Sequence, residues 1–243
     1  MSKALCMCAV LALGSWATAS AQEVTVTGRV ELGGDGARGK TPHAANTVVW
    51  LTPLAGPASL GETPAQFPRP HLRLLQKNKS FDPHVLVVAQ GSVVEFPNAD
   101  PFFHNVFSLF EGKRFDLGLY EAGSTRTVRF DRPGISYIFC NIHPEMSAAV
   151  VVLKTPYYGV SDRTGRIAIP NVPPGSYLLQ VWDEGSLPEE LRSLSREITV
   201  SEQARSLGSI RLTRISSLPL LHKNKYGRDY DNPTPSNPVY KRP

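Results

Sequence analysis

A cysteine, a histidine and a methionine stand close together in the sequence FCNIHPEM (139–146). Cys140, His143 and Met146 follow the spacing C-x2-H-x2-M. A thiolate, two imidazoles and a weak axial thioether form the ligand set of a mononuclear blue-copper electron-transfer site. The segment therefore carries three of these four ligands, and a metal site of this kind needs a second histidine from elsewhere in the chain.

The chain has six histidines, and His104 is the best candidate for the second imidazole. It follows the β-rich run SVVEF (92–96) in the sequence FPNADPFFHNVFS, well before Cys140. His84, in SFDPHVLVV, is expected to be a histidine at the edge of a strand. The others lie in loop-like or terminal segments and carry no argument: His43, His71 and His222.

These segments resemble the plastocyanin and amicyanin group of cupredoxins, which are Greek-key β-sandwiches. VVEFPNADPFFHNVFS is similar to that group's His-Asn pair after a strand, and RPGISYIFCNIHPEM to its Cys, His, Met loop near the end of the domain. The short form C-x2-H-P-x-M is most similar to amicyanin. The resemblance covers about residues 71 to 153, although FSLFEGKRFDLGLYEAGS (107–124) has no place in the plastocyanin pattern.

The resemblance implies a ligand set for one type 1 copper ion: His104, Cys140, His143 and Met146. It also implies that Asn105 steadies the loops by hydrogen bonding. Electrons are then expected to pass through the edge of His143. An apolar rim is expected there from Pro101, Phe102, Phe103 and Pro144, with core packing as the alternative for the two phenylalanines.

Other interpretations of these residues remain open. A thiolate paired with histidine can be a catalytic nucleophile, and zinc binds cysteine and histidine, although structural zinc sites need no methionine. Multicopper oxidases need more histidine clusters, and the chain has neither a His-x-His pair nor a Cys-x-x-Cys-His haem motif. We expect no enzyme, but single-electron transfer between redox partner proteins; the alternatives are a copper carrier or storage protein, or a surface-binding module with structural copper.

The first residues predict where the protein is found. MSKALCMCAVLALGSWATASAQ has a lysine, an apolar run and the small residues Ala19, Ser20 and Ala21, the pattern of a secretory signal cleaved after Ala21. No stretch has the roughly 20 apolar residues that a membrane helix needs, so we expect an exported, periplasmic protein. Only Cys140 then remains, and a lone thiol in an oxidising compartment has to be buried or bound.

Charge and one short motif bear on other partners. The chain has 26 Lys and Arg against 21 Asp and Glu, a mild surplus without long runs that gives no indication of nucleic acid binding. GDGARGKT (34–41) fits the phosphate-loop pattern, but that motif needs a helix directly after it. Pro42 and a β-rich run follow instead, which favours a hairpin loop. Nucleic acid, nucleotide and an integral membrane segment are therefore not expected.

Short β-rich runs separated by glycine, proline, asparagine and aspartate make up most of the chain. They indicate an all-β protein of antiparallel sandwich architecture. The runs lie at 24–32, 46–51, 84–90, 92–96, 125–130, 136–139, 148–153, 166–169, 176–182 and 196–200. One or two turns of helix are expected at 186–194, and FCNIHPEM is expected to join two strands.

A second sandwich is expected around the first. SDRTGRIAIPNVPPGSYLLQV (161–181) and VTGRVELGGDGARGKTPHAANTVVWL (26–51) are similar to the two halves of the carboxypeptidase regulatory-like, transthyretin-like sandwich. A domain can be inserted between such halves because domain termini often lie close together. Trp50 and Trp182 are expected in its core. The predicted parts are a signal peptide (1–21), this sandwich (22–56 and 156–213), a linker (57–70), the cupredoxin domain (71–155) and a Pro-rich tail without a core of its own (214–243).

Overall fold

The structure, a computed structural model, describes residues 22–33, 44–54, 72–109, 111–215 and 223–230. Within these ranges the chain forms sixteen strands and one short helix, α1 (Pro188–Ser193), which confirms the predicted all-β sandwich class. The expected signal peptide, the GDGARGKT loop and the linker at 57–70 lie outside the described residues. Among those described, no helix is long and apolar enough to cross a membrane.

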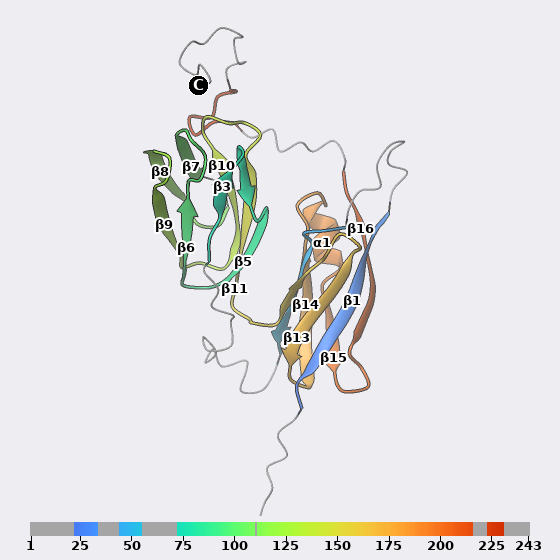
Figure 1. The fold of residues 1–243 in the computed structure, drawn as a ribbon. Coiled ribbons are helices and arrows are strands. Elements are labelled where there is room, and N and C mark those ends of the chain that lie inside the picture. The colour runs from blue at the N-terminus through green and yellow to red at the C-terminus, as the bar shows by residue number, and fades with distance from the viewer. Residues whose placement is uncertain (1–21, 34–43, 55–71, 110, 216–222, 231–243) are drawn as a thin grey trace, which may run out of the picture.

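One group of strands forms the site sandwich, which carries the candidate ligands (Figure 1). Its larger sheet has the strand order β5-β11-β10-β7-β8, and it faces the smaller pairs β6-β9 and β3-β4. The strands are β3 (Leu75–Lys77), β4 (Ser80–Asp82), β5 (Val85–Ala89), β6 (Ser92–Pro97), β7 (His104–Ser108), β8 (Phe115–Tyr120), β9 (Thr125–Phe130), β10 (Gly134–Cys140) and β11 (Ser147–Leu153).

The flanking sandwich is built from strands on both sides of the site sandwich in the sequence. Its two sheets have the orders β13-β1-β16 and β12-β2-β14-β15, with a core of valine, leucine, isoleucine and tyrosine side chains between them. The strands are β1 (Val24–Gly33), β2 (Val48–Pro53), β12 (Tyr158–Val160), β13 (Arg166–Val172), β14 (Gly175–Trp182), β15 (Arg196–Val200) and β16 (Ser206–Thr213).

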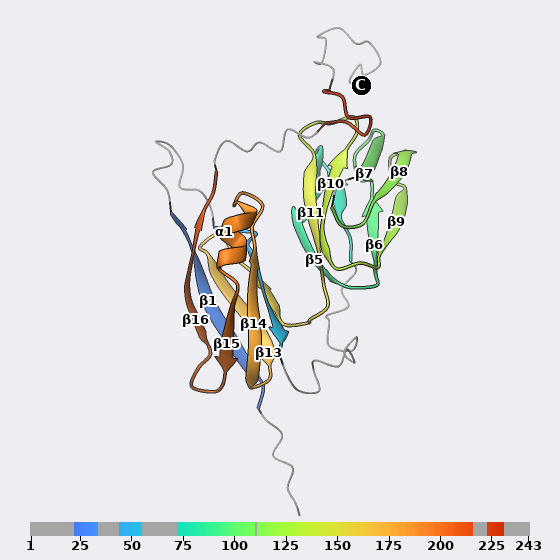
Figure 2. The ribbon, with the colours of Figure 1, turned by 180° about the vertical axis from the view of Figure 1, so that it is seen from behind.

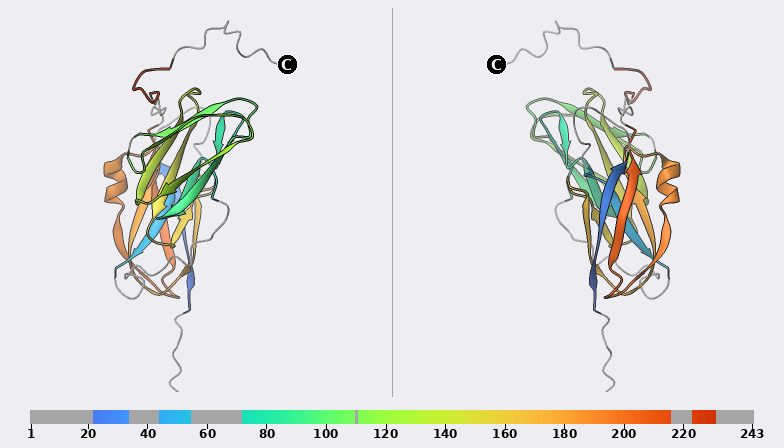
Figure 3. Two further views of the ribbon diagram at one scale, coloured as in Figure 1. Left: turned by 90° about the vertical axis from the view of Figure 1, so that its left-hand side faces the viewer. Right: turned by 90° about the vertical axis from the view of Figure 1, so that its right-hand side faces the viewer.

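The two sandwiches lie side by side, as the front and back views show (Figures 1 and 2). In the views turned by a quarter, one sandwich lies in front of the other (Figure 3). Strand β11 explains this arrangement, because it is buried on both faces. Val150 and Val152 point into the site sandwich, whereas Ala149 and Val151 pack against the flanking sandwich. The continuous apolar run AAVVVL therefore reflects a strand that is covered on both sides.

Trp50 and Trp182 were expected in the core of the flanking sandwich, but neither of them lies there. Trp182 is buried among residues of both sandwiches, and Trp50 packs against the same cluster. The Trp50 indole N–H also donates a 3.1 Å hydrogen bond to the side chain of Gln180. Both tryptophans thus form part of the contact between the sandwiches, because β2 and β14 present their outer faces to the five-stranded sheet.

Two parts of the expected tail (214–243) are described, and both form contacts with the rest of the chain. Arg214 forms hydrogen bonds to the buried Asp183 carboxylate, and Ile215 donates one to the Gly185 carbonyl. Both residues therefore extend the flanking sandwich beyond its last strand. Residues 223–230 are described as well, and they form hydrogen bonds to the loop that follows Cys140. These contacts are hydrogen bonds between polar groups, so no apolar run in the sequence indicates them.

Candidate metal centre

His104 and Cys140 lie at one end of two neighbouring strands of the five-stranded sheet. His104 is the first residue of β7, and Cys140 is the last residue of β10. The two strands are antiparallel, and Cys140 lies opposite Val106. Antiparallel pairing brings the start of one strand next to the end of the other. As a result the Cys140 Sγ lies 3.6 Å from the His104 Nδ1.

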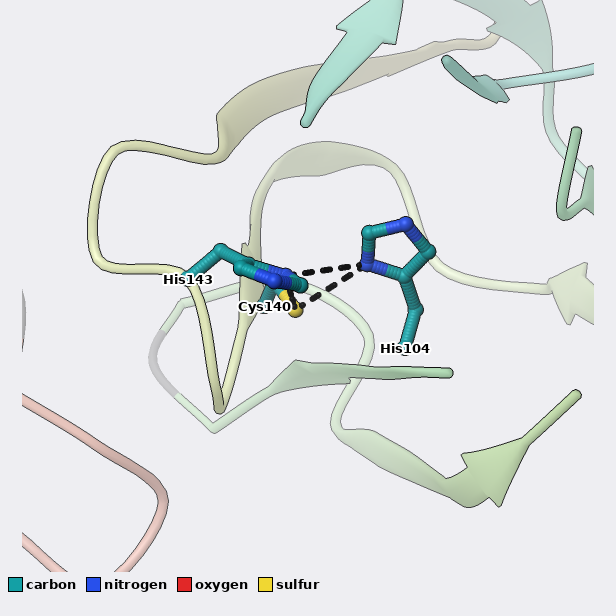
Figure 4. A group of neighbouring side chains, drawn as sticks. All are labelled: His104, Cys140 and His143. Carbon is teal, nitrogen blue, oxygen red and sulfur yellow. Dashed lines mark hydrogen bonds between the residues drawn. The ribbon is translucent and has the colours of Figure 1, made fainter. Parts of the chain in front are cut away.

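His143 comes from the loop between β10 and β11, which is closed by two backbone hydrogen bonds. The Met146 amide donates one of 3.1 Å to the His143 carbonyl, and the Cys140 amide donates one of 3.2 Å to the Met146 carbonyl. The His143 Nδ1 lies 3.5 Å from the Cys140 Sγ and 3.2 Å from the His104 Nδ1. Figure 4 shows the three side chains converging from strand and loop.

The three ligand atoms form a triangle of the size that a metal ion requires. All of them lie within 4.8 Å of one another. The three separations place one point about 2 Å from every atom, close to the bond lengths of about 2.0 to 2.3 Å that zinc forms with imidazole nitrogen and thiolate sulfur. Met146 lies in the same loop as His143, and its side chain is buried in the core of the site sandwich together with Cys140. The residues present therefore fit a transition-metal ion.

Burial sets the protonation of the candidate ligands. Removal from water, together with charge repulsion from the neighbouring His104, lowers the pKa of His143 to about 4. Burial also lowers the pKa of His104, although Asp100 opposes this shift. Both imidazoles are thus neutral near pH 7, and a neutral imidazole is the form that binds a metal. Burial raises the pKa of the Cys140 thiol, so a metal has to displace its proton.

The surface next to the site is partly apolar. The Phe102 ring centroid lies 5.4 Å from those of both His104 and His143, so Phe102 packs directly on the two imidazoles. Phe103 is 45% exposed, and Ile142 is 39% exposed. Pro101 and Pro144 are exposed too. Of the residues expected to form an apolar rim, Phe102 thus packs on the imidazoles, and the other three are exposed.

Asn105 links three segments around the site. Its side-chain amide donates hydrogen bonds to the Asp116 carboxylate at 2.7 Å and to the Gly118 carbonyl at 3.0 Å, both on β8. Its backbone carbonyl accepts one of 2.8 Å from the Asn141 amide. Strand β8 comes from the FSLFEGKRFDLGLYEAGS stretch that the sequence comparison left unplaced. That stretch thus forms the edge of the sheet beside the His104 strand.

Two features of the site were missed in the sequence. The Asp100 carboxylate lies 2.9 Å from the His104 Nε2, and an acidic residue four positions before a candidate ligand was a usable signal. The second feature is the segment 223–230. The Lys225 amide donates a 2.9 Å hydrogen bond to the Asn141 side chain, and the Tyr230 hydroxyl donates one of 2.7 Å to the Cys140 carbonyl. Nothing in the composition of the tail points to these contacts.

Among the described residues, His84 is the histidine that lies outside this group. His84 directly precedes β5, and its ring bridges the two sandwiches. The Nδ1 lies 3.2 Å from the Ser147 carbonyl oxygen, and the Nε2 lies 2.5 Å from the Glu184 carboxylate of the flanking sandwich. His43, His71 and His222 lie outside the described residues.

No family model and no curated protein matches the chain. Among solved structures, it is similar to the Cu-containing nitrite reductase of Thermus scotoductus SA-01, with 26% identity over 34% of this chain and a TM-score of 0.32. The likeness spans only 22% of that reductase. The purple cupredoxin of Nitrosopumilus maritimus shares 22% identity over 33% of this chain and 98% of its own, with a TM-score of 0.31. A reduced Cu(I) amicyanin mutant shares 20% identity over 37% of this chain and 88% of its own, with a TM-score of 0.33. All three are copper proteins by name, but likeness at these TM-scores does not assign the chain to a family.

Proposed function

We propose that this protein binds one type 1 copper ion and transfers single electrons between redox partner proteins. The proposed ligands are His104, Cys140, His143 and Met146. One observation carries the proposal, namely the convergence of two imidazole nitrogens and the thiol of a buried free cysteine within 4.8 Å. The residues come from two adjacent strands and one short loop, so the fold itself holds the ligand atoms together.

The mixture of ligand types favours copper over zinc. Thiolate, thioether and imidazole are all ligand types that suit copper. Structural zinc sites are usually completed by further cysteines or histidines. Here the remaining residue of the C-x2-H-x2-M loop is Met146, which is buried beside Cys140 in the same core. A weak thioether in that place fits the axial position of a blue-copper site.

The residues around the site suit electron transfer more than the conversion of a substrate. Copper, when bound, supplies the one-electron change between Cu(I) and Cu(II). Hydrogen bonds of the sheet hold His104 and Cys140 in place. Asn105 ties the loop that follows Cys140 to strand β8. Such constraints keep the ligand positions similar in both oxidation states. The half-buried His143 and the exposed Phe103 offer a small apolar contact to a partner, in keeping with transient redox encounters.

We further propose that the site sandwich is a copper domain inserted into the flanking sandwich. The cysteine of the site is suited to an exported, periplasmic protein, because it is buried and is the only free cysteine among the described residues. A redox partner would approach the end of the site sandwich where the ligands lie. No enzymatic activity is proposed.

The test is visible absorption and redox titration of the copper-loaded mature protein. An intense thiolate-to-copper band with reversible one-electron cycling is the expected result. His104→Gln and Cys140→Ser should abolish the band, whereas His84→Gln, which changes a histidine outside the group, should keep it. A colourless protein that holds only Cu(I) and passes it readily to a chelator would be a copper carrier, and electron transfer would be ruled out.

A further inference from the structure

Asp100 is a buried carboxylate that joins a turn of the chain to His104. Its Oδ2 lies 2.9 Å from the His104 Nε2 and accepts a 3.0 Å hydrogen bond from the Lys79 amide. Its Oδ1 accepts a 2.6 Å hydrogen bond from the Asn78 amide. Asn78 and Lys79 form the turn between β3 and β4 and both have positive φ angles. Two backbone amides therefore hold the carboxylate in place independently of its contact with the imidazole.

This arrangement determines which nitrogen of His104 carries the proton. Backbone amides donate hydrogen bonds to both oxygens of Asp100, and hydrogen bonds from N–H donors favour the ionised form of a carboxylate. An ionised carboxylate only accepts hydrogen bonds, so the Nε2 of His104 has to carry the proton. The Nδ1, which faces Cys140 and His143, is then left with a free lone pair.

We propose that Asp100 is a positioning residue that holds His104 with its unprotonated Nδ1 toward the metal and that favours Cu(II) over Cu(I). The inference deepens the proposed function and rests on it for the preference between oxidation states. A carboxylate that accepts the second N–H of a ligand histidine fixes the tautomer and makes the ring more basic. A more basic ligand and a nearby negative charge both stabilise the more highly charged ion.

The contrasting possibility is that Asp100 only holds the β3-β4 turn. Its contacts with Asn78 and Lys79 would account for its burial in that case, and the contact with His104 would be incidental. A purely structural role changes the stability of the protein but does not change the tautomer of a ligand or the ratio of Cu(II) to Cu(I) affinity. These two quantities therefore separate the alternatives.

The first test uses the intact, metal-free protein and nitrogen-15 NMR of the histidine rings. The expected result is that His104 carries its proton on Nε2 at pH 7 in the wild type and shifts toward a mixture of tautomers in Asp100→Asn. An Nδ1-protonated His104 in the wild type would overturn the proposal. The wild-type half of this measurement needs neither copper nor a variant, so it can overturn the proposal even if Asp100→Asn fails to fold.

The second test compares Cu(II) and Cu(I) affinities of the wild type, Asp100→Asn and Asp131→Asn. The control removes the same charge from an ion pair with Lys113 on the same sandwich. Loss of a partner of a ligand histidine typically costs about 10-fold to 100-fold in metal affinity, and we expect at least a tenfold selective loss for Cu(II) in Asp100→Asn. A tenfold change in the ratio raises the reduction potential by about 59 mV.

Equal losses for both ions, or an equal shift in Asp131→Asn, would overturn the preference for Cu(II). The two proposals fail in different ways. If the wild type binds no copper, the proposed function fails, while the tautomer of His104 still decides whether Asp100 positions that ring. If copper binds and cycles but the tautomer does not depend on Asp100, only the positioning role is lost.

Discussion

The Tyr230 hydroxyl donates a 2.7 Å hydrogen bond to the backbone carbonyl of Cys140, a residue 90 positions earlier in the chain. Two contacts of Lys225 reinforce this relationship: its amide reaches Asn141 at 2.9 Å, and its ammonium group lies 2.8 Å from the Asp116 carboxylate. A segment that follows the flanking sandwich thus returns to the loop of the metal centre and holds it from outside.

Tyr230→Phe is expected to weaken the protein by about 1 kcal/mol, the usual net value of one hydrogen bond. The ring keeps its packing, and the bond to the Cys140 carbonyl is lost. Urea unfolding of the metal-free protein measures the change. Tyr226→Phe is the matched control, because Tyr226 is 72% exposed and a surface change of this kind stays within about 0.5 kcal/mol. Equal stability of the two variants would show that the bond to Cys140 contributes nothing in solution.

If the protein binds copper as proposed, Met146→Leu is expected to keep the metal and raise its reduction potential. The thioether is a weak donor that helps Cu(II) more than Cu(I), and the axial ligand tunes the potential of such sites. Leucine fills a similar volume at this buried position, so the loss of stability should stay below about 1.5 kcal/mol. Voltammetry measures the shift. Ile142→Leu changes an exposed residue of the same loop, and a potential that moves equally in both variants would remove Met146 from the ligand set.

The contact between His84 and Glu184 predicts a pH-dependent stability. The hydrogen bond that His84 donates to the Glu184 carboxylate raises the pKa of His84 above its usual 6.5, although burial acts in the opposite direction. A raised pKa means that the stabilisation is fully present below about pH 6.5 and is lost as the pH rises through the folded-state pKa. Urea unfolding between about pH 5 and pH 9 measures this slope. Glu184→Gln should flatten the profile there, and parallel profiles for the two proteins would contradict the prediction.

Arg214→Ala is expected to destabilise the flanking sandwich by about 3 to 5 kcal/mol, because it leaves a buried carboxylate without its charged partner. Asp183 is almost completely buried and also accepts a 2.8 Å hydrogen bond from the Thr47 hydroxyl. Thermal or urea unfolding measures the loss. Arg192→Ala removes an arginine from an exposed pair with Glu189 and should cost no more than about 1 kcal/mol. A similar small effect in both variants would mean that the Asp183 contact is not a stabilising ion pair.

Much of the fold could be predicted because strongly apolar strands can be recognised from their residue types. The runs at β5, β6, β9, β11 and β14 were all located from residue types alone. Strands β7, β8 and β16 were not, because polar residues and glycines interrupt their apolar positions: HNVFS, FDLGLY and SLGSIRLT. Such strands form because neighbouring strands supply hydrogen bonds and cover their faces, which is information that lies elsewhere in the chain.

By itself, the sequence determined the types of the candidate ligands and their order, since C-x2-H-x2-M places three of them on one short segment. Only the tertiary structure decided that His104 meets this segment, because the pairing of β7 with β10 joins residues that are far apart in the chain. The same holds for the contact of Asp100 with His104, for the bond of Tyr230 to the Cys140 carbonyl and for the packing of the five-stranded sheet against the flanking sandwich. A residue type states which contacts a side chain can make, but burial and strand register choose the partner.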